Sequence, residues 1–483
     1  MIVNIKNGLI EGVFEKNQYV FKGIPYGEAP IGEKRFSKIQ PKKPWNGVLN
    51  CKEFGDVSLQ NTLENKGDIG SENSLSLNIW TKSLKDGAKK PVVLWIHGGG
   101  FTRGTGSDEK QSGVNFADDN IVYVSLNYRL GVLGFLDLES ILGKDYKSSG
   151  NNGILDIIEG LKWIKENIEF FGGDKDNITV MGESAGAKCI GALLITPLAK
   201  GLFNKAILES GSFQAIRDKD TAKKVTERFL KAAKINKDNK EKLFSLSCEE
   251  ILDAQNKMSN SEVGMLQVFG PVIDGEVFPY GPIEAIDKGV GPMVPLLIGT
   301  NLKEANFYLF LSEDLRNKKE ECIKDIFGEN YKNVFKSYNR DKTSDTDDNS
   351  WQEVLTNYMY KLYSYRLANK FSSLGEDVYL YRFDWSGNIG PCHGQELPFV
   401  FKVTGNEPIL FSLKEEDLPL GEKMNMYWKN FIKNGDPNGS GLIYWNKLTE
   451  EDKSLIVFNK EITTERLNNN WDDKFCLNQG FKL

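Results

Sequence analysis

Long apolar runs are missing from this chain of 483 residues. A helix that spans a membrane needs about 18 or more consecutive apolar residues, and no such stretch occurs, so no membrane span is expected. The first residues alternate apolar and polar side chains, as a strand would, and lack the continuous apolar stretch of a secretion signal. We therefore predict a cytoplasmic protein that does not bind a membrane.

Paired cysteine spacings and a strong excess of either charge are also absent. The 6 cysteines are scattered along the chain, a distribution typical of free thiols in a reducing compartment. The 61 basic and 67 acidic residues are well mixed and give a formal net charge of -6. Binding to nucleic acid or to an anionic surface requires a basic face. Neither is expected as a partner, and no obligate protein partner is evident.

Histidine is scarce, with 2 in the whole chain. His97 ends the apolar run PVVLWI and precedes three glycines, and His393 lies in the Gly/Pro-flanked stretch IGPCHGQELPF. Taken singly, each is by default a structural side chain. Histidine is, however, the most common general base at neutral pH. A serine nucleophile in this chain would have to take its base from these two.

The stretch VMGESAGAKC, residues 180–189, places Ser184 between Gly182 and Gly186. It follows the strand candidate NITVMG and leads into a small-residue stretch that indicates the start of a helix. A serine at such a strand-to-helix turn exposes its Oγ, and the N-terminus of the helix favours developing negative charge. The same five-residue pattern also occurs in turns that merely need small residues, so it requires support from elsewhere.

The HGGG stretch supplies that support, although three glycines after a strand could also bind a phosphate. No G-K-[ST] follows, and the next residues do not open a clean amphipathic helix. Consecutive glycines can turn backbone N–H groups toward the oxygen that becomes negative in acyl transfer. We assign these oxyanion donors to Gly99, Gly100 and Ala185. Because His97 is tied to the glycine loop, His393 is the predicted base.

A carboxylate is needed to orient the imidazole and to stabilise its charged form. Glu304 follows the buried-strand pattern VPLLIGTN and is the candidate acid. The chain order Ser184, Glu304, His393 is that of the α/β-hydrolases. We therefore expect an α/β fold with a large, mostly parallel central sheet flanked by helices.

Ordered motifs along nearly the whole chain resemble those of the type B carboxylesterases, the family of bacterial para-nitrobenzyl esterases, animal carboxylesterases and cholinesterases. The motifs include FKGIPYGEAPIGEKRF (21–36), SENSLSLNIW (71–80), HGGGF (97–101), NYRLGVLGFL (127–136), GESAGA (182–187), CHGQELPFVF (392–401) and YWKNFIKNGDPN (427–438). The resemblance implies a serine esterase with the same triad and oxyanion donors. It also implies that Ser210 supports the triad, although a turn serine is an equal alternative.

Departures from the family pattern refine these expectations. Ser74 stands where the family motif has a cysteine, so the corresponding disulfide cannot form. No tryptophan occurs between Phe54 and Ser71, where cholinesterases carry the one that binds choline. Uncharged esters are therefore expected as substrates, rather than cationic ones. Ala305 replaces a usual glycine beside the candidate acid.

The remaining organisation is that of one domain, residues 1–483, with a helical cap drawn mainly from about 215–380. The charged helical patterns there could equally be a solvated face. Phe101 and Phe213 are candidates for an apolar pocket wall, and each could equally be a core residue.

The sequence thus predicts two-step hydrolysis of small to medium uncharged esters through an acyl-enzyme, with no cofactor and no metal. An amidase or a lipase with the same triad is the main alternative, because preference for the leaving group depends on pocket shape. A binding protein that keeps the fold without catalysis is the third possibility.

Overall fold

The computed structural model describes residues 1–61, 70–84, 87–117, 120–259, 262–328, 331–341, 348–404 and 412–467. Within these residues the strands form an 11-stranded sheet and a 3-stranded sheet. The large sheet has the order β14 (Thr463–Arg466), β13 (Ser454–Phe458), β12 (Val378–Phe383), β11 (Leu296–Asn301), β10 (Lys205–Glu209), β9 (Gly173–Glu183), β7 (Lys90–Ile96), β8 (Val122–Leu126), β6 (Ser76–Thr81), β4 (Gln18–Pro25) and β3 (Val13–Glu15). The small sheet consists of β1 (Ile2–Ile5), β2 (Gly8–Glu11) and β5 (Val48–Asn50).

The strands from β8 across to β13 are parallel, whereas β14 and the β6–β4–β3 edge are antiparallel. Parallel strands are covered on both faces and therefore carry continuous apolar runs. In β7, Val92, Leu94 and Ile96 pack into one core, whereas Val93 and Trp95 pack into a second core on the opposite face. The predicted α/β fold with a large, mostly parallel sheet is confirmed.

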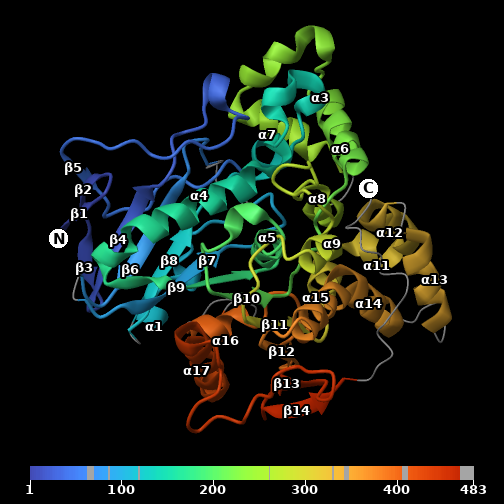
Figure 1. Cartoon of the computed structure of the whole chain (residues 1–483). Helices are drawn as coiled ribbons and strands as arrows, with labels where there is room; N and C mark the ends of the chain where they lie inside the picture. The colour runs from blue at the N-terminus through green and yellow to red at the C-terminus, as the bar shows by residue number, and fades with distance from the viewer. Residues whose placement is uncertain are drawn as a thin grey trace.

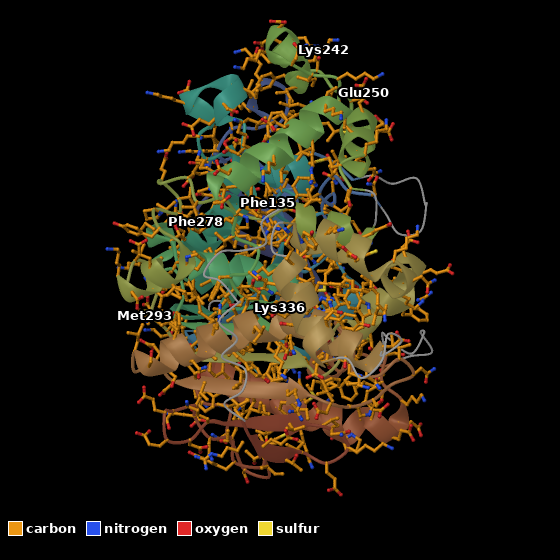
Figure 2. All side chains as sticks on the ribbon, turned by 90° about the vertical axis from the view of Figure 1, so that its right-hand side faces the viewer. Phe135, Lys242, Glu250, Phe278, Met293 and Lys336 are labelled. Atoms are coloured by element: carbon orange, nitrogen blue, oxygen red, sulfur yellow. The ribbon has the colours of Figure 1, made fainter. Side chains whose placement is uncertain are left out.

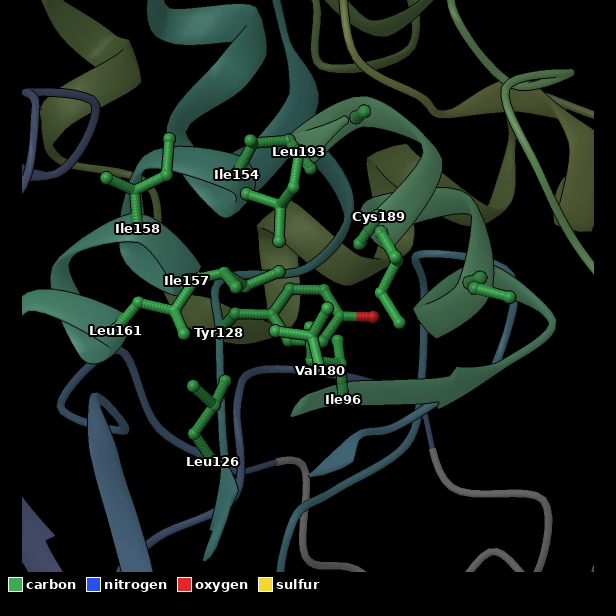
Figure 3. Close-up of a cluster of buried hydrophobic side chains, with 14 of the residues drawn as sticks. Ile96, Leu126, Tyr128, Ile154, Ile157, Ile158, Leu161, Val180, Cys189 and Leu193 are labelled. Carbon is green, nitrogen blue, oxygen red and sulfur yellow. The ribbon is translucent and has the colours of Figure 1, made fainter. Parts of the chain in front are cut away.

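Helices cover the two faces of the sheet as separate layers (Figure 1). One layer contains α4 (Asn152–Asn167), α5 (Ala185–Leu193) and α15 (Leu362–Ser373), and the other contains α1 (Val114–Ala117), α16 (Leu397–Phe401) and α17 (Leu418–Asn434). Figure 3 shows Tyr128 at the centre of the first core, between the isoleucines of α4 and Cys189 of α5. The Tyr128 hydroxyl donates to the His97 carbonyl at 3.0 Å, which links this core to the end of β7.

The predicted cap region contains two groups of helices separated by a sheet strand. The first group is α6 (Lys219–Ala232), α7 (Cys248–Asn256), α8 (Glu262–Val268) and α9 (Pro282–Asp287). The second is α10 (Asn306–Leu311), α11 (Glu313–Asn317), α12 (Lys319–Phe327), α13 (Tyr331–Asp341), α14 (Asp348–Thr356) and the π-helical turn Asn357–Lys361. Figure 2 looks onto this side, with Lys242 and Glu250 at the top and Lys336 near the middle. The range 215–380 thus also includes β11, a strand of the large sheet.

Two short helices, α2 (Gly131–Phe135) and α3 (Glu139–Leu142), complete the α-helices of the described chain. None of the described helices combines the length and the apolar character needed to cross a membrane. Five of the cysteines, at positions 51, 189, 248, 322 and 392, carry free thiols. Cys476 lies outside the described residues.

Candidate active site

Ser184 occupies the turn between the end of β9 and the start of α5. Its backbone angles, φ 54° and ψ −116°, lie in a region that residues with a side chain rarely adopt. The Ser184 N–H donates to Glu209 O at 2.9 Å, and its carbonyl accepts from Lys188 N at 2.9 Å. These two hydrogen bonds hold the strained residue between β10 and the first turn of α5. The turn predicted from the sequence is therefore present.

Gly182 and Gly186 allow α5 to approach the end of β7 closely. A Cβ on Gly186 would lie 1.9 Å from Ile96 O, and one on Gly182 would lie 2.7 Å from the same atom. No side chain can occupy such positions without moving the backbone. The glycines on either side of Ser184 are thus required by packing, and the packing fixes where its hydroxyl points.

The three predicted triad residues lie in one hydrogen-bonded line. His393 Nε2 is 2.8 Å from Ser184 Oγ, and His393 Nδ1 is 2.7 Å from Glu304 Oε2. Ser184 directly follows β9, Glu304 follows β11, and His393 lies in the loop after β12. Parallel neighbouring strands bring their carboxyl ends to one edge of a sheet, which is why residues so distant in sequence meet.

Glu304 is fully buried and is held by more than the histidine. Its Oε1 accepts hydrogen bonds from Ser210 Oγ at 2.6 Å and from Asn301 N at 2.8 Å. Hydrogen bonds to the charged form of a carboxylate stabilise that form and fix its orientation. Ser210 thus reaches the acid of the triad, which is the contact that the family resemblance implies.

The candidate oxyanion donors surround Ser184. Gly99 and Gly100 line the same cavity as Ser184, with φ of 107° and 62°. A Cβ on Gly99 would lie 2.1 Å from Arg103 O, so the loop can adopt this conformation only with glycine at this position. Ala185 is the first residue of α5, where backbone N–H groups have no acceptor within the helix.

His97 has a structural environment and lies apart from the triad. It is buried, stacks on Tyr128 with ring centroids 4.6 Å apart, and its Nδ1 lies 2.9 Å from Gly98 O. Burial lowers the pKa of His97 to about 4, so it is neutral at pH 7. The choice of His393 as the candidate base agrees with this geometry.

A cavity of about 290 Å³ opens beside Ser184 and His393. Phe307, Tyr308, Leu266 and Leu397 contribute to its wall. Phe101 and Phe213 do not line it, in contrast to their expected role as a pocket wall. Both are core residues: Phe101 packs edge-on against Phe135 and Phe213 against Tyr363.

The sequence analysis missed several groups at the site. Glu183 Oε1 lies 3.2 Å from His393 Nε2, and Tyr360 OH lies 3.4 Å from the same nitrogen. Burial and the nearby charge of Glu304 raise the pKa of Glu183 to about 8. The position of Glu183 beside the nucleophile and that of Lys188 in an apolar helix were visible in the sequence. Tyr360 comes from the π-helical turn, for which the sequence carries no signal.

The departures from the family pattern have local explanations. Ser74 is buried, with its Oγ 2.9 Å from Ser58 Oγ. Ala305 N donates to Thr356 Oγ1 at 3.1 Å, which ties the loop of the candidate acid to α14. Residues 62–69 of the loop in which the sequence lacks a tryptophan lie outside the described residues.

Comparison with known proteins identifies one family along nearly the whole chain. The model of the carboxylesterase family matches residues 1–476. The para-nitrobenzyl esterase of Bacillus subtilis (strain 168) is 34% identical over 481 residues, 96% of each chain. The phenmedipham hydrolase of Pseudarthrobacter oxydans is 30% identical over 490 residues, 95% of each chain. The crystal structure of the Geobacillus stearothermophilus carboxylesterase EST55 at pH 6.2 is 37% identical and superposes with a TM-score of 0.85, covering 96% of this chain and 97% of that one.

Proposed function

The chain belongs to the carboxylesterase family, and we propose that it hydrolyses small to medium-sized carboxylic esters through an acyl-enzyme formed on Ser184. The observation that carries this proposal is the line of short contacts from Ser184 Oγ through His393 to Glu304. This line opens into a cavity that Gly99 and Gly100 also reach. The close approach of candidates for a nucleophile, a base, an orienting acid and oxyanion donors supports the proposal.

In the proposed reaction, His393 Nε2 takes the proton of the Ser184 hydroxyl as Oγ attacks the ester carbonyl. His393 Nδ1–H donates to Glu304, which holds the tautomer that leaves Nε2 free to accept. The N–H groups of Gly99, Gly100 and Ala185 stabilise the oxyanion. Such donors are most effective in a site from which water is excluded. The alcohol leaves with a proton from His393, and water then repeats the sequence on the acyl-enzyme.

Substitution of Ser184 and His393 tests this function. Ser184→Ala and His393→Ala each remove a group without which the others cannot act, so we expect kcat for a para-nitrophenyl ester to fall by on the order of 10⁴-fold. Thermal unfolding of each variant shows whether it remains folded. Wild-type turnover by folded Ser184→Ala, or near-wild-type turnover by folded His393→Ala, would contradict the proposal.

An ester and its matched amide, assayed in parallel, distinguish esterase from amidase activity, because the triad alone serves both reactions. The predicted location in the cytoplasm and the role of the two helix groups as a cap over the site belong to the same proposal. The free thiols are consistent with the location. Leu266 of α8 and Tyr308 of α10, which both line the cavity, support the cap.

A further inference from the structure

Lys188 is a buried cation that reaches the active-site cavity. It lies on α5, one helical turn after Ser184, is 2% exposed, and is among the residues that line the cavity. Its Nζ lies 5.2 Å from the centre of the Tyr360 ring. Across the described part of the chain, no hydrogen bond or ion pair joins this nitrogen to another residue. The described residues therefore supply no acceptor for the three N–H donors of Lys188.

A buried ammonium without a partner is costly, because protein surroundings replace its water. Burial and the charge of Arg217 lower the pKa of Lys188 to about 8, so the side chain still carries its charge at pH 7. The Tyr360 ring face compensates only part of the lost hydration. An arrangement of this kind is expected where a ligand supplies the missing acceptor.

The carboxylates near Lys188 do not supply that acceptor. Glu183 lines the same cavity, but among the described residues no hydrogen bond or ion pair joins its carboxyl group to Lys188, and burial raises its pKa to about 8. Glu304 is already bonded to His393, Ser210 and Asn301.

The remaining charged groups on the cavity wall do not alter this balance. Asp108 caps the short turn that follows it, accepting from Lys110 N at 2.9 Å. Arg103 and Lys110 are further cations on the wall. Lys188 therefore adds a positive charge to the cavity wall close to the candidate nucleophile.

We propose that Lys188 binds a carboxylate on the substrate, so that the preferred substrates are esters carrying one free carboxylate close to the scissile bond. This inference rests on the proposed function and names its substrate class. The proposed substrates carry a negative charge, whereas the sequence led us to expect uncharged esters. The apolar wall formed by Leu266, Phe307 and Leu397 accommodates the carbon chain between the two ends.

Two pairs of esters test the inference. The two esters of a pair have the same shape, and one of them carries a carboxylate, on the acyl side of the scissile bond in the first pair and on the alcohol side in the second. Monoethyl succinate and ethyl isocaproate differ by a carboxylate in the acyl part. Acetoxyacetate and isobutyl acetate differ in the alcohol part. We expect the wild-type protein to favour the charged member of one pair by about tenfold or more in kcat/KM, because a site that pairs a buried charge discriminates strongly.

Lys188→Met keeps the length of the side chain and removes its charge. We expect it to abolish the preference through a higher KM for the charged ester, and to lower kcat/KM for the charged ester far more than for the neutral one. Lys205→Met is the matched control. Lys205 is also buried with its pKa lowered to about 8, but it lies on β10 and does not line the cavity. This control should keep the preference.

The outcomes separate the inference from the function on which it rests. Turnover of ethyl isocaproate or isobutyl acetate without a preference for either charged partner overturns the inference alone. A preference that survives in Lys188→Met also overturns it. No turnover of any of the four esters by folded wild-type protein overturns both. If Lys188→Met does not fold, as judged by thermal unfolding, Lys188→Gln is tested in the same way.

Discussion

Two neighbouring serines show how far the role of a residue depends on a single contact. Ser210 and Ser212 both follow β10 and are both fully buried. The Ser210 hydroxyl donates to Glu304 at 2.6 Å, whereas the Ser212 hydroxyl has no hydrogen-bond partner among the described residues. We therefore expect Ser210 to be a positioning residue that acts through the candidate acid.

Ser210→Ala should lower kcat by about tenfold while KM stays unchanged. It removes a hydrogen bond to a charged group, which contributes about 1.5 to 3 kcal/mol, and part of this loss reaches the transition state through His393. Ser212→Ala is the control and should retain wild-type kcat. Steady-state kinetics on one ester checks both variants. Equal effects of the two substitutions would show that packing, and not the contact with Glu304, explains the loss.

At this scale the sequence indicated residues that the structure brings together, but not every contact among them. Ser184, Glu304 and His393 could be predicted because local motifs carry them. The sequence left open whether Phe101 lines a pocket or the core, and in the structure its ring packs against Phe135 in the core. The contact between Ser210 and Glu396, 3.3 Å apart across 186 positions, has no local signal.

At the scale of elements, the turn between β9 and α5 sets the geometry of the site. It brings the first turn of α5 against the end of β7, with Gly186 at the point of contact. The sequence predicted both elements, because a β-branched run precedes Ser184 and small residues follow it. It also predicted the strand VPLLIGTN, which is β11, but did not indicate that this strand divides the helices of the cap region into two groups.

Gly186→Ala should destabilise the protein and reduce the activity of what remains folded. The added Cβ would meet Ile96 O at 1.9 Å, and crowding of this kind costs about 1 to 3 kcal/mol or more. Gly281→Ala is the control, because nothing lies within 4 Å of its Cβ position and its φ is −63°. Thermal unfolding compares the two. A melting temperature of Gly186→Ala equal to that of Gly281→Ala would contradict the close approach.

At the scale of the whole molecule, the site concentrates buried carboxyl groups behind the cavity. Burial raises the pKa of Glu183, Glu209 and Glu396. They come from the ends of β9 and β10 and from the start of α16, so the sheet brings them together. Composition gave no sign of this cluster, because its members are spread through a chain with 67 acidic residues.

The cluster predicts that stability falls as pH rises through the neutral range. The folded-state pKa of Glu183, about 8, lies above the ordinary value of 4.5. Folded protein therefore holds a proton that the unfolded chain releases, and rising pH between about 4.5 and 8 favours unfolding. Lys188 and Lys205 affect the pH dependence of stability only above about pH 8. There the unfolded chain binds the protons that these buried lysines lose, so rising pH favours folding.

Glu183→Gln should flatten this dependence, because the amide cannot ionise. We expect its melting temperature to fall less than that of wild type between pH 5 and pH 8. Glu422→Gln, an exposed carboxyl on α17, is the control and should follow wild type. Parallel curves for wild type and Glu183→Gln would show that Glu183 is already ionised at low pH.

The most direct test of the central claim is to incubate the protein with a fluorophosphonate probe and map the labelled residue by mass spectrometry. A serine activated by a neighbouring base attacks such a probe and keeps it covalently bound. We predict one label, on Ser184, lost in Ser184→Ala and slowed strongly in His393→Ala. Folded wild-type protein that takes up no label, or takes it up on another residue, would contradict the assignment of Ser184 as an activated nucleophile.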